Sequence, residues 1–329
     1  MVNAGVLRAP PITPPVPLRE VVLAGLRQRP KRLPSSFFYD DEGSRLFRRI
    51  MELPGYYLSR AELEILTTAA PRLAGAFAGR SLVVADLGAG DGSKTRVLLQ
   101  ALAGVCPELC YAPIDISMGA LDELGRQRGP ELSGVELDPL VMTCEAGLRE
   151  VGLRHPGHTR LGLLLGSNIG NFTHSEALLL LAELHRALRS GDHLLIGFDL
   201  LKDPELLQRA YADDEGVTAA FNLNLLARMN RELGADFDAG AFRHFARYDP
   251  GKQAMESFLL STRDQLVRIG PECIGFSAWE AMQTEISCKY RETDVLYLAR
   301  NSGFTPVGWY YDGQRRFLDV LLRADSPGR

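Results

Sequence analysis

Residues 81–99, SLVVADLGAGDGSKTRVLL, decide the fold of this chain. A short apolar run, Leu82 to Ala85, is typical of a strand buried in a parallel sheet, and it ends in a turn rich in glycine. We expect Ser93 to cap the helix that follows, because apolar residues recur after it at helical spacing. Gly88 and Gly90 would let a ligand approach bare backbone, and unpaired N–H groups of the helix would hold an anionic group there. This unit predicts an α/β fold with a nucleotide-type pocket.

The residues around this turn indicate which nucleotide it binds. The glycine pattern alone is shared by dehydrogenases and S-adenosylmethionine (SAM) methyltransferases, but Ser93 replaces the third glycine of the dinucleotide fingerprint, which disfavours pyrophosphate binding. A second apolar strand, reading CYAPIDI, ends around Asp115, an acid that suits the ribose hydroxyls of either cofactor. Lys94 lies in the first turn of the helix, where a cation opposes the helix dipole. We therefore expect Lys94 to face a carboxylate, and SAM carries one at that end.

Composition excludes several classes of protein. The 329 residues are 46% hydrophobic, enough for one large domain or two. The 37 basic and 41 acidic residues are mixed along the chain and the net charge is −4, so we expect no nucleic-acid partner. No apolar run approaches the roughly 20 residues of a membrane span, and the first residues do not resemble a signal sequence, so we expect no membrane contact.

The cysteines and histidines show no spacing typical of a metal site. The five cysteines, an odd number, are Cys106, Cys110, Cys144, Cys273 and Cys288. His174, His185 and His193 are expected on the surface or on helix faces. We expect reduced thiols, no metal, a cytoplasmic location and a monomer that acts on a small molecule.

The region before the glycine unit is rich in proline and aromatic residues. Residues 1–32 are expected to form an arm across the body or a partly disordered tail, with a short amphipathic piece from Leu18 to Leu26. Tyr39 and Tyr56 stand in turns, where aromatic rings either cover the edge of a core or form a lid over a site. A helix at 61–73 then leads into the glycine unit.

Another apolar strand that ends in a polar loop follows later in the chain. The strand begins at Leu161 and stops at GSNIGN, residues 166–171, and a capping box at Thr173 starts the next helix. Loops at the carboxyl ends of strands bind ligands in open α/β sheets. Asn168 is interpreted equally well as a left-handed turn residue or as a ligand contact, whereas for Asn171 we favour ligand contact.

The segment after residue 200 changes character. A helical insertion carries Tyr211 on its first helix, and a second helix is expected from about Val217 to Leu233. Strands are expected at 248–260, 267–269 and 282–289. On the last of these, Glu285 and Ser287 share one face, which pattern alone would interpret as exposed to water.

The end of the chain distinguishes between the two enzyme classes. A helix at 294–302 is followed by strands at 305–311 and 316–322, joined by a turn at Asp312. A parallel sheet that ends in such a hairpin resembles a class I SAM methyltransferase, with its Rossmann-like sheet, and differs from half of a dehydrogenase.

Four segments carry a closer family resemblance. They are Leu33 to Arg60, Gly166 to Asn171, Gly216 to Phe237 and Thr284 to Tyr290. Together they resemble the histidine-specific Nα-methyltransferases of ergothioneine biosynthesis, and the similarity covers nearly all of the chain after about residue 30. The resemblance implies a SAM-dependent enzyme whose expected product is trimethylhistidine and which releases S-adenosylhomocysteine.

The resemblance also implies roles for individual residues. Its predicted SAM contacts are Gly88, Lys94, Asp115, Thr143 and Cys144. Its predicted histidine contacts are Tyr56, Asn171, Tyr211, Glu285 and Ser287. Tyr39 corresponds to a tyrosine that lines the reaction centre, and with Asn171 it is the predicted catalytic pair. The implied SAM-binding core is 61–200 with 290–329, and the implied α+β substrate domain is 1–60 with 201–289.

Two departures from the family pattern leave alternatives open. Thr143 and Cys144 stand where the family has an acid and an aromatic residue beside the adenine, and Ser257 stands where histidine enzymes place a methionine. The alternatives are transfer of only one or two methyl groups, an indole amino acid as the substrate, and a SAM-binding regulator without catalysis.

Overall fold

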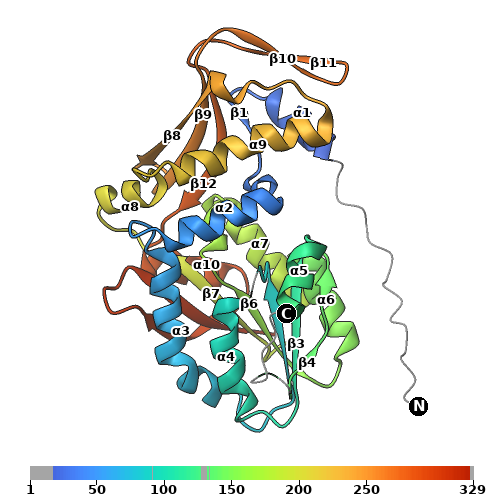
Figure 1. Ribbon diagram of the computed structural model, residues 1–329. Coiled ribbons are helices and arrows are strands. Elements are labelled where there is room, and N and C mark those ends of the chain that lie inside the picture. Colours follow the sequence, from blue (N-terminus) through green and yellow to red (C-terminus); the bar gives the residue numbers. More distant parts are fainter. Residues whose placement is uncertain (1–17, 91, 127–131, 133, 327–329) are drawn as a thin grey trace, which may run out of the picture.

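An eight-stranded mixed sheet forms the larger part of the molecule (Figure 1). The computed structural model describes residues 18–90, 92–126, 132 and 134–326. The strand order is β13-β14-β7-β6-β2-β3-β4, with β5 also pairing to β3. The strands are β2 (Leu82–Leu87), β3 (Leu109–Asp115), β4 (Glu136–Leu137), β5 (Leu140–Val141), β6 (Thr159–Leu164), β7 (His193–Asp199), β13 (Phe304–Tyr311) and β14 (Phe317–Ala324).

Only β14 runs against its neighbours in this sheet. It is antiparallel to β7 on one side and to β13 on the other, whereas β2, β3, β6 and β7 are parallel. This arrangement confirms the predicted class I methyltransferase sheet with its terminal hairpin. The glycine turn follows the end of β2, so it lies at the carboxyl edge of the sheet. Because β2 is a central strand, the turn lies near the middle of that edge.

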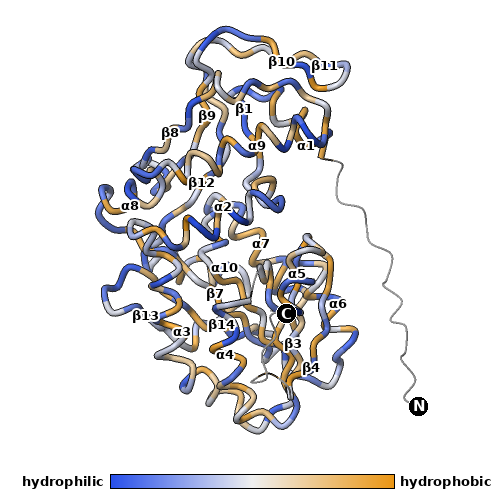
Figure 2. Tube along the Cα trace, in the orientation of Figure 1, coloured by the Kyte–Doolittle hydropathy of each residue, from blue (hydrophilic) through white to orange (hydrophobic). Residues whose placement is uncertain are grey.

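Helices cover both faces of the large sheet. They are α3 (Leu58–Gly75), α4 (Ser93–Ala103), α5 (Met118–Arg126), α6 (Cys144–Arg154), α7 (His174–Ala187) and α10 (Glu292–Asn301). The alternation of side chains along β2 determines which helices meet which face. Val84 packs in one core with α3 and α4, whereas Val83 and Ala85 pack in another with α6, α7 and α10. Figure 2 shows apolar segments along these buried faces and hydrophilic segments in the outer loops.

A second, four-stranded sheet lies above the carboxyl edge of the first in Figure 1. Its order is β1-β12-β9-β8, with β1 (Lys31–Arg32), β8 (Phe242–Asp249), β9 (Ala254–Ser261) and β12 (Ala281–Cys288). A separate hairpin joins β10 (Gln265–Ile269) to β11 (Glu272–Phe276). The associated helices are α1 (Leu18–Leu26), α2 (Asp41–Glu52), α8 (Pro204–Tyr211) and α9 (Val217–Leu233), with 3₁₀ turns η1 (Ser35–Phe38), η3 (Asn168–Asn171) and η4 (Ala239–Ala241). Since β1 pairs with β12 in parallel, segments from both ends of the chain share this sheet.

Several local predictions are wrong in detail. The strand expected at 248–260 is most of β9 preceded by the last residues of β8, because residues 250–253 form the turn of a hairpin between the two strands. Gly92, at φ +66°, takes the cap position of α4, and Ser93 is the first helical residue. His193 is buried on β7 and packs against Phe77. Of the arm expected at 1–32, residues 1–17 lie outside the described residues, whereas the rest contain α1 and β1. Within the described ranges, no helix is both long and apolar enough to cross a membrane.

Candidate functional site

A cleft of about 1470 Å³ lies where the carboxyl edge of the large sheet faces the small sheet. It is lined by the glycine turn after β2, the end of β3, the segment between β6 and α7, and parts of α2 and β12. Nine of the eleven predicted site residues line it: Tyr39, Tyr56, Gly88, Lys94, Asp115, Thr143, Cys144, Asn171 and Glu285. The remaining two, Tyr211 and Ser287, are buried next to the cleft.

The glycine turn presents backbone to the cleft. Gly88 and Gly90 have φ values of +76° and +55°, which side chains with a Cβ rarely adopt. The nearest atom to a Cβ at Gly88 would be Asn168 Nδ2, at 3.5 Å, so the bare turn leaves room for a ligand. Asp115 accepts hydrogen bonds from the backbone of Gly90 (3.3 Å) and Ser117 (2.9 Å), which hold its carboxylate at the tip of β3.

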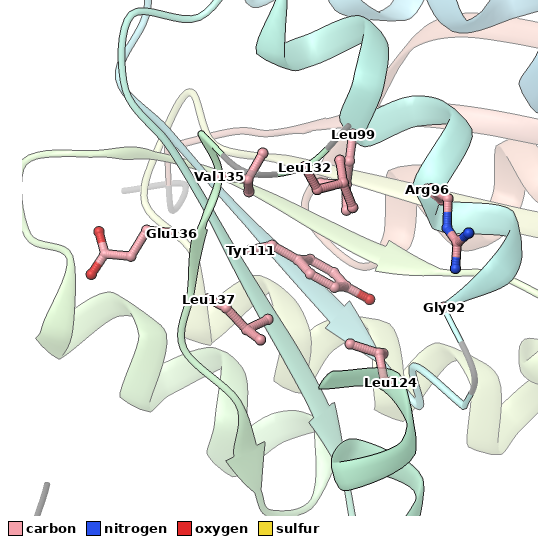
Figure 3. A pocket seen from close by; sticks show the side chains of 9 residues that line it. All are labelled: Gly92, Arg96, Leu99, Tyr111, Leu124, Leu132, Val135, Glu136 and Leu137. Carbon is pink, nitrogen blue, oxygen red and sulfur yellow. The ribbon is translucent and has the colours of Figure 1, made fainter. Parts of the chain in front are cut away.

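Below the turn, a buried carboxylate fixes the start of α4. Asp86 accepts hydrogen bonds from Thr95 Oγ1 (2.7 Å) and Tyr111 Oη (2.9 Å), and burial raises its pKa to about 6. Figure 3 shows the Tyr111 ring among Leu124, Leu132 and other apolar residues that line a small cavity of about 30 Å³. That volume suffices for about one water molecule, so this cavity cannot hold the substrate or the cofactor.

Lys94 has a carboxylate partner inside the protein. Its ammonium forms an ion pair with Glu62 on α3, a side chain that is fully buried. The other oxygen of Glu62 accepts from the backbone N–H of Gly166 at 2.6 Å. Burial lowers the pKa of Lys94, but the charge of Glu62 outweighs it and raises the pKa overall, so the ammonium stays charged. Sequence reasoning missed Glu62, although a charged residue on the apolar stripe of a helix is a signal of this kind.

The two residues predicted from the resemblance to meet the adenine, Thr143 and Cys144, are themselves uncharged. Thr143 caps α6 by accepting from the backbone of Ala146 at 3.4 Å. Desolvation, with the nearby charges of Glu145 and Asp115, raises the pKa of the Cys144 thiol to about 12. The thiol is therefore neutral, and it packs as a small apolar group.

An aromatic wall lines the opposite side of the cleft. The Tyr39 ring lies 5.6 Å from Phe47 and 5.9 Å from Phe221, and Phe47 lies 6.1 Å from Tyr56, between ring centroids. Tyr39 is 41% exposed, toward the cleft, whereas Phe221 is buried behind it. Desolvation by the surrounding protein, with the charges of Glu285 and Asp115, raises the pKa of the Tyr39 phenol. The phenol is therefore neutral.

Glu285 places a carboxylate in the cleft wall. Ser257, its partner on β9, donates a hydrogen bond to Glu285 Oε2 at 3.1 Å. Burial raises the pKa of Glu285, against the lowering effects of Ser257 and Lys289. The interpretation of Glu285 and Ser287 as a face exposed to water is wrong, because one is half-buried in the cleft wall and the other is buried.

Ser287 belongs to a buried polar cluster with Tyr211, Lys289 and Asp199. Tyr211 Oη donates to Ser287 Oγ at 2.7 Å, and Lys289 Nζ contacts both hydroxyls and the Asp199 carboxylate. The charges of Lys289 and Lys202 outweigh the effect of burial and hold the pKa of Asp199 below its usual value. The role of Lys289 was not predicted, because a lysine at the end of a strand is usually exposed.

Asn171 ends η3 and lines the same cleft as the glycine turn and Glu285. Its neighbour Gly170 packs closely on β12, since a Cβ there would lie 3.0 Å from the carbonyl oxygen of Cys288. This contact holds Asn171 next to the strand that carries Glu285. In the described part of the chain, His, Cys, Asp and Glu form no cluster of three or more that could hold a metal ion.

Comparison with known proteins agrees with this arrangement. The family described as histidine-specific, SAM-dependent methyltransferases matches residues 18–324. The chain is 40% identical over 309 residues to the histidine N-alpha-methyltransferase of Mycolicibacterium smegmatis, which covers 93% of this chain and 95% of that protein. It is 41% identical over 297 residues to the protein of the same name from Mycobacterium tuberculosis, covering 90% and 91%. It is also 31% identical over 301 residues to ergothioneine biosynthesis protein 1 of Neurospora crassa, covering 90% of this chain and 33% of that protein.

Proposed function

We propose, because the chain belongs to the family of histidine-specific, SAM-dependent methyltransferases, that it transfers methyl groups from SAM to the α-amino group of L-histidine. We propose complete methylation, to Nα,Nα,Nα-trimethylhistidine, as a step of ergothioneine-type biosynthesis. The names of the relatives support the substrate and the pathway. The observation in this chain that carries the proposal is the half-buried Glu285 carboxylate, which faces the same cleft as the glycine turn.

The residues at the carboxyl edge of the large sheet fit SAM. When bound, SAM supplies an electrophilic methyl group on a sulfonium. The open backbone at Gly88 admits the cofactor, and the Asp115 carboxylate accepts from its ribose hydroxyls. Lys94, held by Glu62, receives its carboxylate. Thr143 and Cys144 offer neutral contacts to the adenine, in place of the charged contact of related enzymes.

The residues on the other side of the cleft bind histidine. Tyr56, Asn171 and Tyr211 orient the α-amino and α-carboxylate groups, and Glu285 accepts the imidazole N–H. A hydrogen bond to a buried charged acceptor of this kind contributes roughly 1.5 to 3 kcal/mol. Ser287 faces the second ring nitrogen.

Catalysis by this site consists mainly of positioning. Methyl transfer to an amine is an in-line displacement that needs a neutral amine at short range, so correct placement supplies much of the rate. The apolar surroundings favour loss of the ammonium proton, because desolvation disfavours the charged form. Tyr39 and Asn171 line the reaction centre, and the Tyr39 ring, backed by Phe221, faces the growing positive charge.

We propose that these two sides correspond to two domains. Residues 61–200 and 290–329 would bind SAM, and residues 1–60 and 201–289 would bind histidine, with Asn171 of the first group reaching the substrate from η3. The pairing of β1 with β12 supports a unit built from both ends of the second group. We also propose a cytoplasmic monomer, in line with a small-molecule substrate.

The test is to incubate the pure protein with SAM and each of the common amino acids and to weigh the products. We expect histidine alone to be converted, with a mass increase of three methyl groups at completion. Conversion of tryptophan in preference to histidine would contradict the proposal, and a product that stops at one or two methyl groups would contradict complete methylation. SAM binding without conversion of any amino acid would indicate a regulator.

A further inference from the structure

The side chain of Lys289 lies at the end of β12, behind the cleft wall, and is fully buried. Its ammonium contacts Asp199 Oδ2 at 2.9 Å, Tyr211 Oη at 2.9 Å and Ser287 Oγ at 2.8 Å. An ammonium has three hydrogens and no lone pair. All three are therefore used, two of them on hydroxyl groups that can only accept from it.

These contacts leave the Ser287 hydroxyl with one hydrogen-bonding role toward a ligand. A hydroxyl group has one hydrogen and two lone pairs. Ser287 Oγ accepts from Lys289 at 2.8 Å and from Tyr211 Oη at 2.7 Å, which occupies both lone pairs. Only its O–H remains, and it can only donate.

Ser287 lies close enough to the cleft to meet a ligand. It is two residues from Glu285 on the same strand, and its side chain is 4% exposed. Its Oγ lies 3.4 Å from the position that a Cβ on Gly170 would take, directly before the cleft residue Asn171. The site thus combines a carboxylate, which accepts, with a hydroxyl that donates.

We propose that Lys289 is a positioning residue that restricts Ser287 to donating, so that the site selects a neutral imidazole ring with one N–H toward Glu285 and one unprotonated nitrogen toward Ser287. This inference rests on the proposed function and deepens it. An imidazolium ring carries hydrogens on both nitrogens, so its second N–H would oppose the Ser287 hydrogen. Without Lys289, the hydroxyl could turn and accept from that N–H.

Other titratable side chains face this cluster, and they are present whichever amino acid is bound. Glu285 lies on β12, which ends directly before Lys289. Asp199 ends β7 and Lys202 follows it, Tyr211 ends α8, and Tyr57 caps α3. Tyr39 and Tyr56 belong to the aromatic wall. The titration of the groups that face only the amino-acid backbone, like that of the ligand's α-amino group, affects the two ligands equally, and Glu285 accepts from an N–H on both rings. The ratio of the affinities of two ligands that differ only in the ring therefore reports on the protonation of that ring.

The experiment compares L-histidine with β-(1,2,4-triazol-3-yl)-alanine, whose ring also has an N–H and unprotonated nitrogens but stays neutral in mild acid. Dissociation constants are measured by calorimetry with S-adenosylhomocysteine present. Because an unperturbed histidine side chain has a pKa of about 6.5, we expect the affinity of histidine relative to the triazole to fall about tenfold between about pH 8 and about pH 5.5. A ratio that does not change with pH would overturn the inference while leaving the proposed function intact. Failure of both ligands to bind at either pH would overturn both.

Variants then test Lys289 itself. In Lys289→Met we expect the ratio to change less than about threefold over the same pH range, because the freed hydroxyl can accept from imidazolium. The matched control is Lys202→Met, which removes the other ammonium from Asp199 without touching Ser287, and it should keep the tenfold change. If Lys289→Met does not fold, Ser287→Ala should show the same flat ratio. A wild-type pH response in whichever of these two variants is measured would overturn the inference.

Discussion

At the scale of single residues, we expect Glu285 to determine which ring the site accepts. In Glu285→Gln we expect kcat/KM for histidine to fall roughly 10-fold or more, because loss of the charged acceptor costs over about 1.4 kcal/mol. Steady-state kinetics with histidine measures this change. Calorimetry with SAM and thermal unfolding should show little change, since Glu285 lies on β12, away from the glycine turn.

The ratio of two substrates tests the same residue further. Tryptophan offers one N–H and more bulk than histidine, so it gains nothing from a second polar contact. In Glu285→Ala we therefore expect kcat/KM for tryptophan to rise relative to that for histidine. An unchanged ratio would show that Glu285 does not contact the substrate ring, even if the protein remains a methyltransferase.

His193 makes stability depend on pH. Burial, with the positive charge of Arg80, lowers its pKa to about 4, and its Nδ1 atom has no hydrogen-bond partner in the part of the chain that the structure describes. Since the unfolded chain binds the proton at a pKa of about 6.5, stability is lost as the pH falls below that value. We expect a loss of about 3 kcal/mol from this residue between about pH 7 and about pH 4.

Urea unfolding of wild type and His193→Leu at the two pH values measures this contribution. The variant should lose less stability on acidification than wild type does, by about that amount. Equal losses in the two proteins would show that His193 is not buried in its neutral form.

At the scale of elements, Asp40 holds α2 against α9. Its carboxylate caps α2 by accepting from Gly43 N (2.7 Å), and it accepts from Asn224 (2.8 Å) and Arg231 (2.6 Å) on α9. Asp40→Ala should destabilise the protein by about 1 to 2 kcal/mol, through loss of the cap and of these contacts. It should also raise KM for histidine, because Tyr39 is the adjacent residue.

The control for this prediction is Glu42→Ala, two residues further along the chain. Glu42 forms an exposed pair with Arg45, so we expect the free energy of unfolding to stay nearly unchanged. Chemical denaturation of both variants gives the comparison. Equal destabilisation would mean that the cap and the link to α9 contribute no more than a surface ion pair.

Elements whose signal is local were predictable from the sequence. The capping box at Thr173 forms both reciprocal hydrogen bonds with Glu176, and Gly234, at φ +62°, ends α9. Pairing between distant segments was not predictable. The two-residue strand β1 joins β12, about 250 positions away, and no periodicity marks a strand this short.

The same distinction applies to the candidate site. Glycine and acid residues at strand ends placed the cofactor side of the cleft, because parallel strands end at one edge. The buried ionic partners, Glu62 and Lys289, could not be placed, since the usual state of a charged side chain is exposure and only the assembled fold buries them.

At the scale of the whole molecule, the cleft joins two sheets that contribute different residues. Asp115 ends β3 of the large sheet, whereas Asn171 lies where η3 packs against β12 of the small sheet. If the two sides bind different molecules, each can be weakened separately. This separation is the property that a cleft with a cofactor side and a substrate side requires.

Asp115→Asn should therefore weaken SAM binding about tenfold or more, because it replaces a charged acceptor, and should leave the affinity for histidine within about threefold. Asn171→Ala should do the reverse, raising KM for histidine or abolishing turnover while SAM affinity is nearly unchanged. The matched control is Asp122→Asn, at an exposed position on α5, which should change neither. Calorimetry with SAM and, separately, with histidine in the presence of S-adenosylhomocysteine measures both affinities. An equal loss of both affinities in either variant, with thermal unfolding unchanged, would show that the two sides of the cleft do not act separately and would contradict its division into a cofactor side and a substrate side.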